Sequence, residues 1–233
     1  WLAEARRMAL PRRSGFRVGA VVETAEGDLA LGFNLELGPA TLHAEQAAVV
    51  RAWERGTQGI ERLWVDAAPC GHCRQFLLEA HNPDLRVCFH GRSERLARLL
   101  PDPFTPGALG VHASPFGRPA NLPNDNLEAT ARRAAARSHT PYTRASRGLA
   151  ARLATGEVLS ASTFESVAFN PSVPAVMSLY AQVLGMGRRT TDVAEVVLAC
   201  TAQSSSEVAL TRAVLAAEAP ACTVREVDGD EID

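Results

Sequence analysis

Two passages of the chain repeat one order of apolar and polar segments. In the first passage the pattern predicts a hairpin, a helix, a strand, a helix and a strand, over 16–22 with 29–36, 44–55, 63–67, 73–81 and 85–89. Gly56 is placed to end the first helix. Asn82-Pro83 is placed to end the second, because the residue before a proline disfavours helical geometry.

The second passage gives the same order after an opening helix over 127–138. Its hairpin, helix, strand, helix and strand are predicted over 147–154 with 157–163, 174–184, 193–200, 206–217 and 222–227. Such a repeat indicates internal duplication of one α/β unit. The sequence therefore predicts an α/β protein of two α/β/α units with mixed sheets, over 1–100 and 127–233. Between them, 101–126 is rich in Pro, Gly and Asn and is predicted to be an extended linker.

Composition narrows the class of protein. The chain has 233 residues, 46% hydrophobic content and a net charge of −2, as expected for a soluble globular enzyme. The near-neutral charge disfavours a nucleic-acid partner, and the sequence predicts neither a membrane span nor a signal peptide. All 24 basic residues are Arg, so chemistry that needs a lysine, such as a Schiff base or a Walker A phosphate site, is excluded.

Two short segments carry the candidate chemistry, His-Ala-Glu at 43–45 and Pro-Cys-Gly-His-Cys at 69–73. They supply three candidate zinc ligands, His43, Cys70 and Cys73, and catalytic zinc sites use three protein ligands and one water. An H-x-E segment followed by P-C-x-x-C is the known signature of zinc nucleobase deaminases. Alone, the C-x-x-C segment is also compatible with a structural zinc site or a redox pair. A structural site normally has a fourth Cys or His, and a redox pair needs no H-A-E upstream.

Both ligand groups stand where a loop enters a predicted helix. The partial positive charge of a helix N-terminus is expected to lower the pKa of Cys70 and Cys73, so that both bind zinc as thiolates. Zinc would lower the pKa of a water in the fourth position. Glu45, two residues after His43, is expected to move the water's proton as general base and acid. The alternative is that Glu45 only interacts with the helix dipole.

The neighbours of the motif are weaker candidates. His72 is expected to be exposed and not a ligand, and Arg74 is either a donor to a thiolate or an ordinary surface arginine. In the second copy, the H-A-E position falls near 172–174 and the cysteine loop near 202–206, where no ligand residue stands. We therefore expect one zinc ion per chain and no chemistry in the second unit.

These residues resemble the cytidine deaminase family, specifically its long, two-domain homodimeric form. The matching segments are Phe16 to Ala20, Asn34 to Glu36, His43 to Ala48, Pro69 to Phe76, Leu100 to Pro106, Arg137 to Tyr142 and Glu165 to Ser172. The segments of the second half are absent from short deaminases, which makes the resemblance to the long form specific.

The resemblance implies six substrate contacts: Phe16 on the pyrimidine, Asn34, Leu35 and Glu36 at the ribose, the backbone of Ala44 at the base, and Phe104 from the partner subunit. Three departures stand out. Six residues separate Glu36 from His43, fewer than is usual, so the loop over the ribose should be tighter. Almost nothing precedes Phe16, where the long form has a small helical segment. Thr105 stands where the family commonly has Gly.

The sequence thus predicts a zinc-dependent catalytic domain over 1–100 and a degenerate domain without zinc over 127–233. The expected reaction is hydrolytic deamination of cytidine and 2′-deoxycytidine to uridine and 2′-deoxyuridine, in cytoplasmic pyrimidine salvage. One alternative is a non-catalytic zinc-stabilised binding or assembly protein, against which the intact Glu45 argues. The other is a deaminase of a related nucleoside or an RNA base, which the 6% aromatic content does little to support.

Overall fold

The computed structural model describes residues 1–201 and 205–229, in two compact units. The first unit comprises 1–36, 42–120 and 165–173, and the second comprises 37–41, 121–164 and the described residues from 174 onward. Residues 101–120, inside the expected linker, thus belong to the first unit. Among the described residues, none of the helices combines the length and the hydropathy that crossing a bilayer requires.

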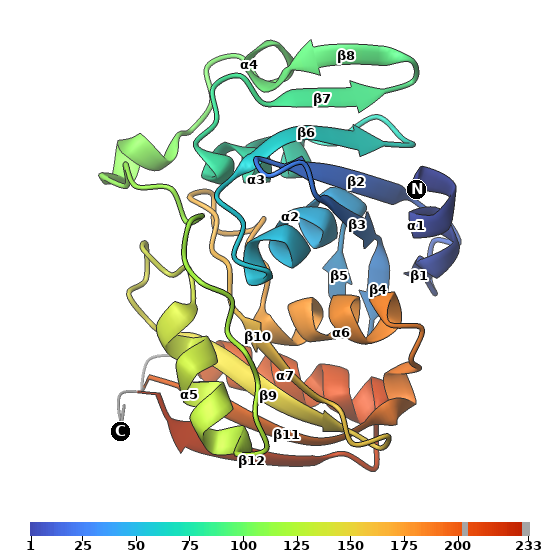
Figure 1. Cartoon of the computed structure of the whole chain (residues 1–233), viewed down its shortest axis with the longest axis vertical. Helices are drawn as coiled ribbons and strands as arrows, with labels where there is room; N and C mark the ends of the chain where they lie inside the picture. The colour runs from blue at the N-terminus through green and yellow to red at the C-terminus, as the bar shows by residue number, and fades with distance from the viewer. Residues whose placement is uncertain (202–204, 230–233) are drawn as a thin grey trace. The chain divides into compact units, whose positions relative to one another are not determined.

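Figure 1 labels the α-helices and strands, and the 3₁₀ helices are called η1 to η3. Up to residue 120 they are α1 (Leu2–Met8), β1 (Leu10–Pro11), β2 (Gly19–Thr24), β3 (Leu29–Phe33), β4 (Leu35–Leu37), β5 (Ala40–Leu42), α2 (Ala44–Glu54), β6 (Ile60–Val65), α3 (Gly71–Phe76), η1 (Leu77–Ala80), β7 (Arg86–Phe89), β8 (Arg92–Arg95), α4 (Leu96–Leu99) and η2 (Pro106–Leu109). After it they are α5 (Leu127–Arg137), β9 (Arg147–Leu153), β10 (Val158–Ser162), α6 (Ala175–Gly185), η3 (Thr190–Asp192), β11 (Val193–Cys200), α7 (Ser205–Glu218) and β12 (Thr223–Asp228).

The two main sheets share one topology. The first has the order β3-β2-β6-β7-β8, and the second has the order β10-β9-β11-β12. In each, the first three strands are antiparallel neighbours and the third and fourth are parallel. Both sheets are therefore mixed, and the first four strands of each match in order and direction, which confirms the predicted two-unit α/β architecture.

The central strands of each main sheet are covered on both faces. The consecutive β11 residues Val196 to Ala199 are all fully buried, as are Ala20 and Val22 of β2, with Val21 nearly so. Because neighbouring side chains on a strand point to opposite faces, burial of consecutive residues means that both faces are covered. On one face of the second sheet, α5 packs Ala131 and Ala135 against Val197.

A short helix precedes Phe16, contrary to the expectation that almost nothing does. A Cβ at Gly19 would lie 2.6 Å from the Arg6 nitrogen of α1, and one at Gly148 would lie 2.3 Å from the Ala135 nitrogen of α5. Glycine thus lets a helix approach β2 in the first unit and β9 in the second, and these two strands have the same place in their sheets. α1 is therefore the first unit's counterpart of α5.

The predicted return strand over 29–36 is broken at Asn34. β3 ends at Phe33, and β4 belongs to a separate three-stranded sheet with the order β1-β4-β5. The break arises because the Asn34 side chain bonds the backbone of Phe16 and Val18, so those two residues lie outside β2. The hairpin strand predicted over 16–22 accordingly begins only at Gly19.

The other observed elements differ less from their predicted bounds. The helix predicted over 73–81 starts at Gly71 and continues as the 3₁₀ helix η1, and the strand predicted over 63–67 is β6 over Ile60–Val65. The strand β8 and the short helix α4 were not predicted. In the second half every predicted helix and strand is present, with ends within about two residues.

Candidate active site

Three metal-ligand candidates lie together at the starts of two helices. His43 directly precedes α2, Cys70 directly precedes α3, and Cys73 lies in its first turn. His43 Nδ1 is 3.5 Å from Cys70 Sγ and 3.3 Å from Cys73 Sγ, and the three donor atoms lie within 4.8 Å of one another. Tetrahedral zinc, with its usual Zn–N and Zn–S bond lengths, holds nitrogen and sulfur ligands about 3.5 Å apart. The three residues therefore fit zinc.

Close packing of α2 on the sheet places this cluster. A Cβ at Gly32 of β3 would lie only 2.2 Å from the Ala44 carbonyl oxygen and the Ala48 nitrogen. Without a side chain at residue 32, the first turn of α2 lies directly on β3. His43 and Glu45 are consequently held on a helix start that packs against a buried strand.

The cluster shares its protons when no metal is bound. The pKa of Cys70 is lowered to about 3, because Cys73 and His43 donate to its sulfur. The pKa of Cys73 is raised, because its thiol donates to Cys70 and because it is buried. The hydrogen bond to Cys70 also raises the pKa of His43. One thiolate is thus already present for a metal to bind.

Glu45 is a buried carboxylate beside the cluster. It is 4% exposed, and burial raises its pKa. Its side chain shares a hydrogen bond with Cys73, so it lies against the candidate ligands without being one of the three donors. A carboxyl group in this position can hold a proton and release it, as acid/base chemistry requires.

His72 and Arg74 support the loop of the cysteine motif. His72 is exposed, as expected, and its ring stacks on that of His43 with centroids 5.4 Å apart. Arg74 donates from Nε to the Pro69 carbonyl at 2.9 Å and from Nη1 to the Leu99 carbonyl at 2.8 Å. Its guanidinium therefore holds the loop through backbone oxygens.

Two of the expected substrate residues lie next to each other. Phe16 is 61% exposed, so its ring is accessible for stacking. Asn34 accepts the Val18 N–H on Oδ1 and donates from Nδ2 to the Phe16 carbonyl, both at 2.8 Å. The amide of Asn34 thus shapes the segment that carries the Phe16 ring. Leu35, by contrast, is fully buried, so only its backbone is available to a ligand.

The other three expected substrate residues, Glu36, Ala44 and Phe104, differ in how accessible they are to a ligand. Glu36 accepts the backbone N–H groups of Arg13 and Ser14 at 2.5 and 2.9 Å. Hydrogen bonds, above all from the Ser14 side chain, lower its pKa. Ala44 is fully buried. Phe104 is 47% exposed, and its carbonyl accepts a hydrogen bond from Gln75 at 2.6 Å.

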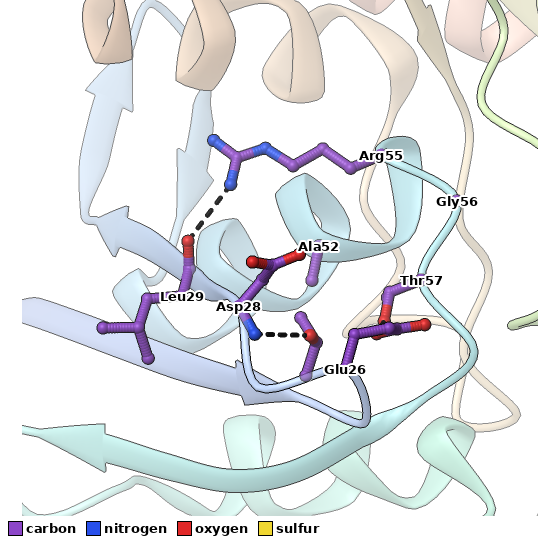
Figure 2. Close-up of a pocket in the computed structure, with 8 residues that line it drawn as sticks. Glu26, Asp28, Leu29, Ala52, Arg55, Gly56 and Thr57 are labelled. Atoms are coloured by element: carbon purple, nitrogen blue, oxygen red, sulfur yellow. Dashed lines mark hydrogen bonds between the residues drawn. The ribbon is translucent and has the colours of Figure 1, made fainter.

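A separate cavity of about 490 Å³ lies at the other end of α2 (Figure 2). Its lining residues are Thr24, Glu26, Asp28, Leu29, Ala52, Arg55, Gly56 and Thr57. There the Asp28 N–H bonds the Thr24 hydroxyl, and Arg55 bonds the Leu29 carbonyl, both at 3.1 Å. α2 has 11 residues and is about 16 Å long, so this cavity is remote from His43 and takes no part in the candidate chemistry.

In the described residues of the second unit, the helix start that corresponds to His43 carries no metal ligand. α2 and α6 both have 11 residues, and alignment of their starts places Pro174 on His43 and Val176 on Glu45. The structural alignment thus differs from the predicted one, in which 172–174 correspond to 43–45. Neither alignment places a metal ligand at this helix start of the second unit. The expected counterpart of the cysteine loop falls partly on 202–204, outside the described residues. Within 1–201 and 205–229, the His43 cluster is the one group suited to a metal.

Sequence reasoning missed Gln46 and Glu79. Gln46 accepts the His43 N–H at 3.0 Å, and the fully buried Glu79 accepts the Val167 N–H at 2.7 Å. A glutamine at the third helical position is a recognised capping signal and could have identified Gln46. Nothing local predicts the bond of Glu79 to Val167.

Comparisons with known proteins agree with this geometry. Two family models, both described as the cytidine and deoxycytidylate deaminase zinc-binding region, match residues 2–89 and 96–213. The cytidine deaminase of Cronobacter sakazakii is 38% identical over 195 residues, or 80% of this chain and 66% of that protein. That of Vibrio atlanticus is 40% identical over 176 residues, or 69% of this chain and 58% of that protein. The chain thus spans less than two thirds of the length of these relatives.

The solved structure of cytidine deaminase from Mycobacterium tuberculosis is 33% identical, with a TM-score of 0.42. The match covers 44% of this chain and 90% of that one.

Proposed function

Because this chain belongs to the cytidine and deoxycytidylate deaminase family, we propose that it hydrolyses cytidine and 2′-deoxycytidine to uridine and 2′-deoxyuridine, with release of ammonia. The observation that carries this proposal is the buried Glu45 carboxylate against the His43, Cys70 and Cys73 cluster. A purely structural metal site needs no such acid/base group, which disfavours a non-catalytic binding protein.

In the proposed mechanism, His43, Cys70 and Cys73 would hold one zinc ion. When bound there, zinc would lower the pKa of water and so supply a nucleophile at neutral pH. Glu45 takes one proton from the attacking water and delivers it to N3 of the pyrimidine. It then takes the proton of the new C4 hydroxyl group and delivers it to the amino group, which leaves as ammonia. Burial of Glu45 keeps bulk water from competing for that proton.

The proposed substrate contacts are those that the family resemblance implies, and the accessibility of Phe16 supports them. The exposed Phe16 ring stacks on the pyrimidine, and the backbone of Ala44 contacts the base. Asn34 and Glu36 bond the ribose hydroxyls. A carboxylate has about four acceptor positions, so Glu36 can take a hydroxyl and keep its two backbone donors. Leu35 takes part only through its backbone, because its side chain is buried.

The wider organisation is also a proposal. The catalytic domain is assigned to 1–100, the linker to 101–126 and the zinc-free domain to 127–233. The protein acts as a cytoplasmic homodimer in pyrimidine salvage, with Phe104 reaching the site of the partner subunit. The exposed Phe104 ring supports this arrangement, because a large apolar side chain on a surface is suited to a partner.

One assay tests the proposed reaction. The zinc-loaded protein should convert cytidine and 2′-deoxycytidine, seen as loss of absorbance, and a zinc chelator should abolish the conversion. Added zinc should restore it. Absence of turnover with both nucleosides in protein that contains zinc would refute the assignment.

A further inference from the structure

Gln46 is a buried polar residue in the first turn of α2, only 2% exposed. Its Oε1 accepts the backbone N–H of His43 at 3.0 Å, and its Nε2 donates to the Pro171 carbonyl at 2.6 Å. The same nitrogen lies 3.4 Å from His72 Nε2. One amide group therefore joins the start of α2, the α3 residue His72 and a segment 125 residues further along the chain.

Pro171 belongs to residues 165–173, which we call the strap. The strap packs within the first unit, although the sequence on either side of it belongs to the second. Besides the bond from Gln46, it has a second anchor, because the fully buried Glu79 accepts the Val167 N–H at 2.7 Å. Two buried side chains of the first unit thus hold the strap.

Hydrogen bonds inside the strap fix its shape. The Phe169 N–H donates to the Ser166 carbonyl at 2.8 Å, and the Ser166 N–H donates to the Ser172 hydroxyl at 2.9 Å. Phe169 has a φ of 58°, which is unusual for a residue with a side chain. This closed turn presents the Pro171 carbonyl to Gln46.

The strap determines how the Gln46 amide is oriented. The Pro171 carbonyl can only accept, so the amide nitrogen must face it and the amide oxygen must face the His43 N–H. The reverse orientation would place the amide NH₂ against the His43 N–H, donor against donor. It would also place the amide oxygen against the Pro171 carbonyl, acceptor against acceptor, in a buried site. The orientation in turn fixes the backbone of His43, whose imidazole faces Cys70 and Cys73. The stacked ring of His72 adds a second contact to the same imidazole.

We infer that Gln46 is a positioning residue through which the strap orients the His43 ligand. The second half of the chain, which has no metal cluster in its described residues, thereby completes the first unit's metal site within the same chain. The inference rests on the metal-binding part of the proposed function and does not depend on the identity of the substrate.

Gln46→Met tests this inference, because methionine keeps the length of the side chain and removes both hydrogen bonds without adding charge. Its matched control is Gln182→Met in α6, where Gln182 Nε2 donates to the Ser160 carbonyl at 2.8 Å. Zinc affinity is measured by competition with a chromophoric chelator, and ligand geometry by the absorption spectrum of the cobalt-substituted protein. Gln46→Met should bind zinc about 10–100-fold more weakly, as is typical when an outer-shell partner of a ligand is removed. Gln182→Met should bind zinc like the wild type.

The outcomes separate the inference from the reaction. Wild-type zinc affinity and an unshifted cobalt spectrum in Gln46→Met would overturn the positioning role, even if activity fell. Weakened zinc binding in a protein that never deaminates cytidine would support the positioning role and refute the proposed reaction. If Gln46→Met does not fold, Ser172→Ala loosens the strap turn without touching α2. Zinc affinity should then also fall, and an unchanged affinity would overturn the inference.

Discussion

The Glu207 carboxylate accepts the backbone N–H of Ala175 at 3.0 Å, at the start of α6. α6 is the second unit's counterpart of α2, which begins after His43. Glu207 also accepts from the Thr163 hydroxyl and pairs with Arg147 at 2.8 Å. In the second unit, an ion pair thus stands at the helix start that has a metal-ligand cluster in the first unit.

Glu207→Gln should destabilise the protein. The side chains of Arg147 and Glu207 are only 11% and 8% exposed, so the change removes one charge of a buried ion pair. Removing one partner of a buried pair typically costs about 3–5 kcal/mol. Urea unfolding measures the loss. Glu226→Gln is the control, because its pair with Arg212 is half exposed and should change stability by less than about 1 kcal/mol. Equal effects of the two changes would contradict a structural role for the buried pair.

Glu45→Gln should abolish turnover while the bound zinc is kept. The amide cannot carry the proton, and general acid/base catalysis usually contributes about 10²–10⁴-fold to the rate. The variant is assayed with cytidine after its zinc content has been shown to match the wild type. Turnover near the wild-type rate in that zinc-loaded variant would rule out Glu45 as the proton carrier.

Elemental analysis should give one zinc ion per chain. Cys73→Ala should lose that zinc, because the buried Cys73 is one of only three protein donors. Cys88→Ala is the matched control, since Cys88 lies on β7 and bonds Ser93 at 3.3 Å, outside the cluster. Two tightly bound ions per chain, or full zinc retention in Cys73→Ala, would contradict the single site.

The elements of the second half were predictable because their signals are local. β9, β11 and α7 are long, strongly patterned segments with clear turns between them. α1 escaped prediction because it has seven residues with just one buried, Ala5, so it shows almost no apolar stripe. The four-residue strand β8 has no buried residue, and its alternation cannot be recognised from sequence.

The candidate site was predictable only where its residues form local motifs. His43, Cys70 and Cys73 stand in two compact motifs whose spacing alone indicates a metal. The bond from Gln46 to Pro171 joins residues 125 apart, and no local pattern specifies it. The assignment of the strap to the first unit depends on such distant contacts, which only the folded chain reveals.

Glu26→Gln should reduce the dependence of stability on pH in acid. Donation from the Thr57 hydroxyl, and next from the Gln58 N–H, lowers the pKa of Glu26 from 4.5 to about 2 (Figure 2 shows Glu26 beside Thr57). A carboxylate with a lowered pKa stabilises the fold fully above pH 4.5 and loses that contribution as pH falls through about 2.

Urea midpoints of wild type and Glu26→Gln, compared from pH 7 to pH 2, measure this contribution. The difference should be largest at neutral pH and should shrink below pH 4.5. Glu61→Gln, at an exposed position of β6, is the control for the loss of one surface charge. A difference between wild type and Glu26→Gln that does not vary with pH would contradict the assigned hydrogen bonds.

Phe104→Ala should raise KM or lower kcat while zinc content stays at one per chain. The ring is 47% exposed, and we expect it to complete the site of the partner subunit in a homodimer. Sedimentation measures the oligomeric state, and steady-state kinetics with cytidine measure the loss. An active monomer would contradict the shared site.

A mixed dimer of Phe104→Ala and Glu45→Gln chains gives the sharper test. If each site combines Glu45 of one chain with Phe104 of the other, one site of the mixed dimer carries both defects and the other carries neither. Each mixed dimer should therefore have close to half of the wild-type activity, more than either impaired parent. Sites confined to single chains would each keep one defect, and no activity would return. Verified mixed dimers without recovery would thus show that Phe104 acts within its own chain, and the proposed reaction would still stand.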